Sequence, residues 1–277
     1  HEFEATVIND NISDSLSDCG CTYMGNFTIP ETISYNDNIY TVTAIGSVAF
    51  AWAGITSVTL PTTLTKIEDR AFSGCRSLTS IYLHENLNEI GFNIFDGCDE
   101  LARIDVDDRN KCFTSIDGVL YTKDLCKLIC WPCKNESEIQ LLPPTTHISP
   151  CALMNCTIPS NIISEGICVI TEKSFYCCIM DSIIIPSGIQ SIEANAFYGC
   201  WHLKEVICLC NVPPHINSDS FWMPSQITLH VPAGCAESYR RAEYWKDFGQ
   251  IVEDVYTAIA EICDSPLSTP LYDLQGR

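Results

Sequence analysis

Three cysteines in the middle of the chain have a spacing that could bind a metal ion. They form the pattern Cys126-x3-Cys130-x2-Cys133. Thiolates at such separations in a hairpin can bind zinc, but a structural zinc site ordinarily has four ligands, and nearby only Cys112 could supply the fourth. We therefore expect no metal site and no cofactor.

Cysteine could also act as a nucleophile, but this requires a histidine base within hydrogen-bond reach. The histidines that could serve are spread over the chain with no local signature: His84, His147, His202, His215 and His230. No glycine-rich phosphate loop is present, and the acidic run at 105–108 lacks the spacing of a calcium loop. The sequence therefore predicts that the chain is not an enzyme.

The chain also contains a repeating pattern in which an isoleucine precedes a bulky apolar residue by five positions. The pattern occurs seven times, at Ile45/Phe50, Ile67/Phe72, Ile90/Phe95, Ile148/Leu153, Ile170/Phe175, Ile192/Phe197 and Ile216/Phe221. Successive isoleucines lie 22, 23, 58, 22, 22 and 24 residues apart. A period of about 23 residues is typical of a solenoid, interrupted here once. We predict a β-rich repeat solenoid with short helical turns, an inserted β-hairpin and capping segments.

Part of the cysteine content follows the same period. Of 18 cysteines, five stand three residues after the bulky position: Cys75, Cys98, Cys156, Cys178 and Cys200. A small apolar thiol at a core-facing position favours packing, so we expect these cysteines to be thiols. Neighbouring coils lie about 5 Å apart, which overlaps the Cα separations of disulfides, so cross-linking remains an alternative.

The charge of the chain restricts its partners. Acidic residues outnumber basic ones 35 to 15, which gives a formal net charge of −20. Such a surface repels phosphate backbones, and we expect no nucleic acid partner. The charge favours solubility, with recognition of a basic partner as the alternative.

The strand segments of the repeats predict one candidate binding surface. In 55–61, 78–84 and 101–107, apolar residues at the first, fourth and sixth places point inward, so the fifth place points outward. Steps of 23 residues before and after the interruption suggest one continuous sheet. We expect a mixed apolar and polar stripe, able to bind a partner, formed by Thr59, Tyr82, Asp105, Ile184, Ile207 and His230.

The remaining segments flank or interrupt the repeats. Turn clusters and short alternating stretches predict a β-rich cap at 1–40, repeats at 41–110 and a β-hairpin insertion at 111–146, in which Asp117-Gly118 is a strong turn pair. Further repeats are expected at 147–229, and a C-terminal cap with a helix-prone stretch at 230–256. Prolines among Ser and Thr make 257–277 a tail.

The repeat carries a recognisable motif, Leu78-x-x-Ile81-x-Leu83-x-x-x-Leu87-x-x-Ile90-x-x-x-x-Phe95-x-x-Cys98. It resembles the BspA-like, or treponemal-type, leucine-rich repeats of bacterial surface proteins. The similarity covers about residues 40–253, and the segments at 113–132 and 231–253 are similar to those of Bacteroidetes members. The chain departs from the pattern at Trp52-Ala53, where the first unit lacks its cysteine, and at Leu153.

The resemblance implies a secreted or surface-attached protein, and residues 271–277 look like the start of a C-terminal segment common in secreted Bacteroidetes proteins. No run of 18 apolar residues is present and no signal peptide begins the chain, so we expect that a targeting segment was removed, with a cytosolic protein as the alternative.

Some relatives are adhesins, so we expect a monomeric, non-catalytic module that binds a host extracellular matrix or mucosal protein. One alternative is a glycan-binding module using Trp52, Trp201 and Trp222, and another is a structural spacer without a ligand.

Overall fold

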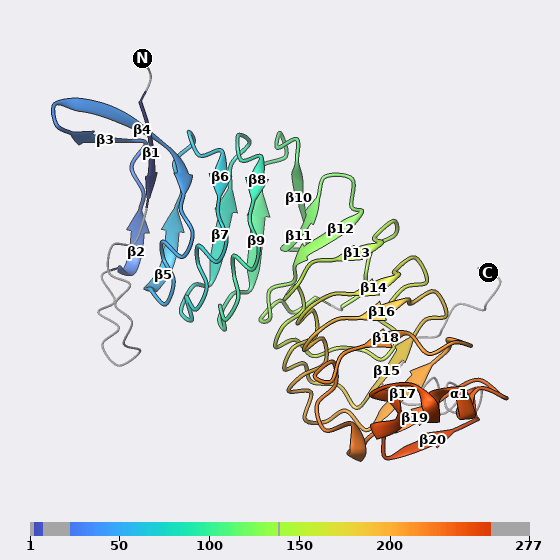
Figure 1. Cartoon of the computed structure of the whole chain (residues 1–277). Coiled ribbons are helices and arrows are strands. Elements are labelled where there is room, and N and C mark those ends of the chain that lie inside the picture. Colours follow the sequence, from blue (N-terminus) through green and yellow to red (C-terminus); the bar gives the residue numbers. More distant parts are fainter. Residues whose placement is uncertain (1–2, 8–22, 138, 256–277) are drawn as a thin grey trace. The chain divides into compact units, whose positions relative to one another are not determined.

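The computed structural model describes residues 3–7, 23–137 and 139–255, which fall into two compact units. Of the described residues, 3–7, 23–137 and 149–154 belong to unit 1, and 139–148 and 155–255 belong to unit 2. Figure 1 labels the strands and the helix along the chain. The predicted tail at 257–277 lies outside the described residues.

Unit 1 contains two parallel ladders, each made of one strand per coil. One ladder has the order β1(Phe3–Val7), β4(Asn38–Ile45), β6(Lys66–Ile67), β8(Glu89–Ile90), with β3(Thr32–Tyr35) antiparallel to β4. The other has the order β2(Met24–Thr28), β5(Gly54–Thr59), β7(Ser80–Leu83), β9(Arg103–Val106). Ile45 pairs with Ile67, and Ile67 pairs with Ile90. Each coil of the repeat therefore adds one strand to each of the two ladders.

An antiparallel segment follows the third coil of unit 1. The strands β10(Phe113–Ile116) and β11(Val119–Thr122) pair across Asp117 and Gly118, which both have positive φ. The strand β12(Lys127–Cys130) pairs with β11 and is also antiparallel. Residues 113–130 therefore leave the repeat and form a hairpin extended by a third strand.

Unit 2 repeats the two-ladder arrangement. One parallel ladder has the order β14(Val169–Ile170), β16(Ser191–Ile192), β18(His215–Ile216). The other has the order β15(Ser182–Ile185), β17(Glu205–Cys208), β19(Thr228–His230), β20(Gln250–Val252), and β13(His147–Ile148) comes before both in the chain. The predicted solenoid with units of about 23 residues is confirmed, because partners such as Ile170 and Ile192, or Ile192 and Ile216, are one repeat apart.

Helix is scarce in the described ranges. The short helices are η1(Pro224–Gln226), α1(Ala236–Arg241) and η2(Trp245–Asp247), and α1 lies in the stretch expected to be helical. Tyr239 of α1 and Trp245 of η2 are buried, with ring centroids 5.3 Å apart, and Phe248 stacks on Trp245. These aromatic side chains complete the core at the last coil.

The turns between the two ladders donate backbone hydrogen bonds to the next coil. In the Ile67/Phe72 coil, Arg70 and Gly74 have positive φ, two residues before and after Phe72. The N–H groups of Arg70, Phe72 and Gly74 donate to the carbonyls of Phe92, Ile94 and Asp96, respectively. Because every second N–H points at the neighbouring coil, the turn satisfies its backbone without an α-helix.

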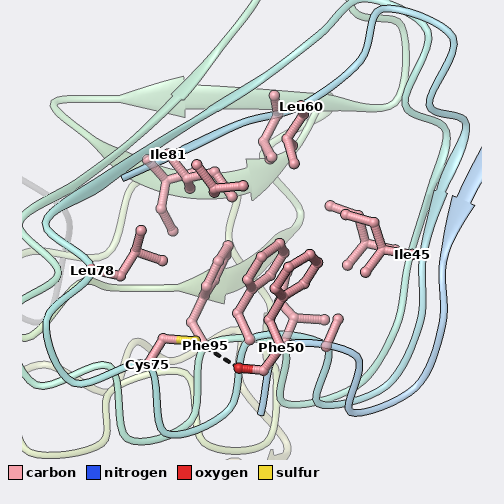
Figure 2. Close-up of a cluster of buried hydrophobic side chains, with 14 of the residues drawn as sticks. Ile45, Phe50, Leu60, Cys75, Leu78, Ile81 and Phe95 are labelled. Carbon is pink, nitrogen blue, oxygen red and sulfur yellow. Dashed lines mark hydrogen bonds between the residues drawn. The ribbon is translucent and has the colours of Figure 1, made fainter. Parts of the chain in front are cut away.

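The bulky column forms the centre of each unit. In unit 1 the rings of Phe50 and Phe72 stack at 5.3 Å, and those of Phe72 and Phe95 at 5.9 Å (Figure 2). In unit 2 the centroids of Phe175 and Phe197 lie 5.1 Å apart. The predicted inward positions are buried in the three strands of unit 1, except that Val106 is half-buried.

The recurring cysteines pack as thiols in this core. Cys75 Sγ donates to the Phe50 carbonyl at 3.0 Å, as Figure 2 shows, and Cys98 and Cys200 make the same bond to Phe72 and Phe175 at 3.2 Å. Each bond links a coil to the preceding one. The prediction of packing thiols is confirmed for these three cysteines.

Close contact between coils gives a test of the packing at Gly91. A Cβ atom at this position would lie 2.5 Å from the Asp69 backbone nitrogen and 2.7 Å from the Glu68 carbonyl carbon. Because backbone atoms cannot move aside cheaply, we expect Gly91→Ala to lower the free energy of unfolding by about 1–3 kcal/mol. Urea unfolding followed by circular dichroism measures this.

Gly188 provides the matched control. The nearest atom to a Cβ there is the Glu165 carbonyl oxygen at 3.4 Å, which is an ordinary contact. Gly188→Ala should change the free energy of unfolding by less than about 0.5 kcal/mol. Equal effects of the two substitutions would show that the coils do not approach as closely as described.

Candidate binding surface

One face of the β2-β5-β7-β9 sheet in unit 1 carries polar and aromatic side chains. Strand pairing places Thr28 beside Thr59 and Tyr82 beside Asp105, and the β5–β7 register puts Thr59 next to Tyr82. A second outward row runs Asn26, Ser57, Ser80, Arg103. We call these two rows the unit 1 face.

Tyr82 is fixed on this face by a charged neighbour. Its side chain is 44% exposed, and its hydroxyl donates to Asp107 Oδ2 at 3.0 Å. Arg109 donates to both carboxylate oxygens of Asp107 and also pairs with Glu85 at 3.0 Å. Hydrogen bonds from Arg109 hold the pKa of Asp107 well below its usual range, and the bond to Asp107 raises the pKa of Tyr82. The phenol is therefore presented in one orientation.

The other polar groups of the face are also held in place. Arg103 forms a forked interaction with Asp105, with Nε donating to Oδ2 at 2.8 Å. Asn26 Oδ1 accepts hydrogen bonds from the hydroxyls of Thr56 and Ser57. A surface whose side chains are ordered beforehand loses less conformational entropy when it binds.

The other half of the predicted stripe differs from expectation. The outward register is as predicted, because Ile184 pairs with Ile207 and Ile207 with His230. However, Ile184 is 7% exposed, Ile207 is 0% exposed and His230 is 8% exposed. The expectation that these three residues form an exposed stripe is wrong.

Contacts from the residues after β20 explain part of this burial. Ile184, Ile207 and Val255 form one buried cluster, with Leu209 packed against it. His230 Nδ1 lies 2.6 Å from Asp254 Oδ1. The expected continuity also fails, because Thr59, Tyr82 and Asp105 lie in one sheet, and Ile184, Ile207 and His230 lie in another.

The cysteines of the metal hypothesis do not form a ligand set. Cys133 Sγ donates to the Asp99 carbonyl at 3.2 Å, while burial raises the pKa of Cys130 to about 12 and also raises that of Cys126. Within the described ranges, no group of three or more Cys, His, Asp or Glu side chains is arranged to hold a metal.

Two of the histidines contact oxygen atoms rather than cysteine thiols. His84 Nε2 lies 2.8 Å from the Leu60 carbonyl oxygen, and His147 Nδ1 lies 2.9 Å from the Thr146 hydroxyl. His202 and His215 are exposed. None of these contacts is the thiol–imidazole pair that a cysteine nucleophile requires.

The three tryptophans proposed for glycan binding separate into two places. Trp201 and Trp222 are in contact in unit 2, with ring centroids 4.7 Å apart. Trp52 lies in unit 1, where the Arg76 guanidinium sits 5.7 Å from its ring centroid. The three tryptophans can be identified from the sequence, but which of them are in contact depends on which coils are neighbours.

Parallel ladders, stacked phenylalanines and repeats of about 23 residues together define a leucine-rich-repeat solenoid. The model of the BspA type Leucine rich repeat region matches residues 43–122 and 127–240 in six copies, and the chain belongs to this family.

Two solved structures are similar to the chain, and the first of them supports the fold. A leucine rich cell surface protein from Faecalibacterium prausnitzii A2-165 has a TM-score of 0.55 and 19% identity over 86% of this chain and 90% of its own. The pneumococcal vaccine antigen PcpA has a TM-score of 0.48 and 19% identity over 85% of this chain and 90% of its own. No curated protein gave a significant sequence match. None of the helices in the described ranges has the length and apolarity needed to cross a bilayer.

Proposed function

We propose that the chain is a non-catalytic, secreted or cell-surface module that binds a protein partner through the unit 1 face. The observation that carries this proposal is the exposure of that face: Thr59 is exposed, Asp105 is half-buried and Tyr82 is 44% exposed. The corresponding residues of unit 2 are buried. Membership of a repeat family with surface proteins among its structural neighbours supports the proposed location.

The chemistry of the face suits a protein ligand. Tyrosine and arginine are the residue types enriched where binding energy concentrates, and Tyr82 and Arg103 lie on neighbouring strands. Asp105 and Asp107 hold these two side chains in defined positions. The hydroxyl and amide groups around them, from Asn26 to Ser80, can form the polar rim that such interfaces have.

A host extracellular matrix or mucosal protein is the partner class we propose. The formal net charge of −20 repels the phosphate backbone of nucleic acids. The same charge favours partners with basic surfaces, and binding to them should weaken as salt is added.

The test measures binding of a double variant. We expect Tyr82→Ala/Arg103→Ala to bind a purified matrix protein or mucin at least about tenfold more weakly than the unmodified chain, because truncation of interface anchors typically costs more than about 1 kcal/mol each. Surface plasmon resonance on a panel of such proteins gives the dissociation constants.

Tyr35→Ala is the control, because Tyr35 is 66% exposed and lies on β3, in the other sheet of unit 1. It should bind like the unmodified chain. If the double variant and the unmodified chain bind equally, the unit 1 face is not the site. If the unmodified chain binds nothing on the panel, a spacer without a ligand becomes the better account.

A further inference from the structure

A cluster of four aromatic side chains lies on one corner of unit 2. It consists of Tyr176, Tyr198, Trp201 and Trp222, which we call the aromatic corner. Tyr176 and Tyr198 stack at 5.6 Å, Tyr198 meets Trp222 edge-on at 4.5 Å, and Trp222 meets Trp201 edge-on at 4.7 Å. The four rings therefore form a connected row across successive coils.

The fold itself does not require aromatic residues at these positions. Tyr176, Tyr198 and Trp222 each follow a phenylalanine of the core column, and the same place in unit 1 holds Ala51, Ser73 and Asp96. Trp201 follows Cys200, as Arg76 follows Cys75 and Asp99 follows Cys98. Arg76 and Asp99 form an ion pair at 3.5 Å. The same turn is thus made with small or charged residues in unit 1.

Trp201 is the exposed member of the aromatic corner, and Tyr176, Tyr198 and Trp222 are half-buried. Trp201 is 68% exposed, and Ile179, which occupies the same repeat position one coil earlier, is 53% exposed. Large apolar side chains exposed in a group often mark an interaction site.

We propose that the aromatic corner binds an uncharged carbohydrate chain. The negative face of an indole or phenol ring attracts the partially positive C–H groups that line one side of a pyranose ring. Trp201 has the most exposed ring for this stacking, while the tyrosine hydroxyls can bond sugar hydroxyls. The four side chains carry no charge at neutral pH, and the acidic chain disfavours sulfated or sialylated glycans.

A glycan array that holds neutral, sialylated and sulfated oligosaccharides tests this site. The unmodified chain should bind a subset of the neutral glycans, and Trp201→Ala should bind the same glycans at least tenfold more weakly. Trp52→Ala is the matched control, because Trp52 is also an exposed tryptophan (52%) but lies in unit 1. Trp52→Ala should bind like the unmodified chain. Since the Trp201 side chain is mostly exposed, its variant should unfold at a temperature close to that of the unmodified chain.

Three results would overturn the proposal. The first is that the unmodified chain binds none of the arrayed glycans. The second is that Trp201→Ala binds as tightly as the unmodified chain. The third is binding of a glycoprotein at the aromatic corner that persists after enzymatic removal of its glycans, which would identify a protein ligand. None of these results bears on the unit 1 face, since Tyr82 and Arg103 are unchanged in every variant used.

Discussion

Replacing Phe197 with alanine is expected to lower the free energy of unfolding by about 3–5 kcal/mol, because it removes a large side chain from the centre of a column and leaves a cavity. Phe197 is 0% exposed, and its ring stacks between Phe175 at 5.1 Å and Phe221 at 5.0 Å. The surrounding coils are bonded to one another, which limits how far they can collapse into the space. Urea unfolding followed by circular dichroism measures the loss.

Two substitutions calibrate this result. Phe197→Leu should cost less than Phe197→Ala, because Leu153 already occupies the same place in another repeat and is fully buried there. Tyr35→Ala, at an exposed position, should change the free energy of unfolding by less than about 0.5 kcal/mol. A loss below about 1 kcal/mol for Phe197→Ala would contradict the view that the column stabilises the coils.

Alkaline pH is expected to unfold the protein through its buried thiols and phenols. Burial raises the pKa of Cys200 from 9.0 to about 12, and that of Tyr121 from 10.0 to about 12. Below pH 9 the Cys200 thiol is protonated in both states, so stability is complete. Between pH 9 and 12 only the unfolded chain releases this proton, and the free energy of unfolding falls by about 1.4 kcal/mol per pH unit for each such group.

Urea unfolding at a series of pH values from 8 to 11, in the presence of a reductant, tests this dependence. Stability should hold up to about pH 9 and then decline steadily. Cys200→Ala removes one titrating group, so its decline should be shallower by about 1.4 kcal/mol per pH unit, whatever its stability at pH 8. A chain that is equally stable at pH 8 and pH 11 would show that these groups are not buried as thiols and phenols.

The features that depend on local periodicity could be predicted from the sequence. The five-residue spacing between Ile67 and Phe72 occurs seven times in the chain, so it reveals both the solenoid and the inward side of the strands. Cys75 belongs to the same column, and its packing as a thiol follows from that position. A pattern within one repeat is enough for these inferences because each coil contacts mainly its neighbours.

The turn between β3 and β4 is another local feature that the sequence indicates. Asn36 and Asp37 have φ values of 49° and 60° and join the two strands in a tight hairpin, as expected of an Asn-Asp pair within the turn clusters of residues 1–40. Some of the left-handed residues that flank the core phenylalanines are harder to predict. Arg70 and Lys173 are not residues that favour this conformation, and bonds to the next coil impose it.

The candidate site could be predicted only in part. The register correctly gave the outward residues of both units, but register does not determine exposure. Ile207 is buried because Val255, far along the chain, packs against it, and His230 is buried beside Asp254. Tyr82 is fixed by the hydrogen bond that its hydroxyl donates to Asp107, which lies in the next repeat, and this bond depends on how the two coils are stacked. Such contacts are set by tertiary packing, which no single repeat encodes.

Site-specific photo-crosslinking tests the proposed binding face most directly. A photoreactive amino acid is placed at Thr59, which is exposed at the centre of the unit 1 face, or at Gln190, which is exposed in unit 2. Each chain is then irradiated with the matrix or mucosal protein that the unmodified chain binds. We predict a covalent product from position 59 and none from position 190. Crosslinking from position 190 without any from position 59 would contradict the assignment of the unit 1 face.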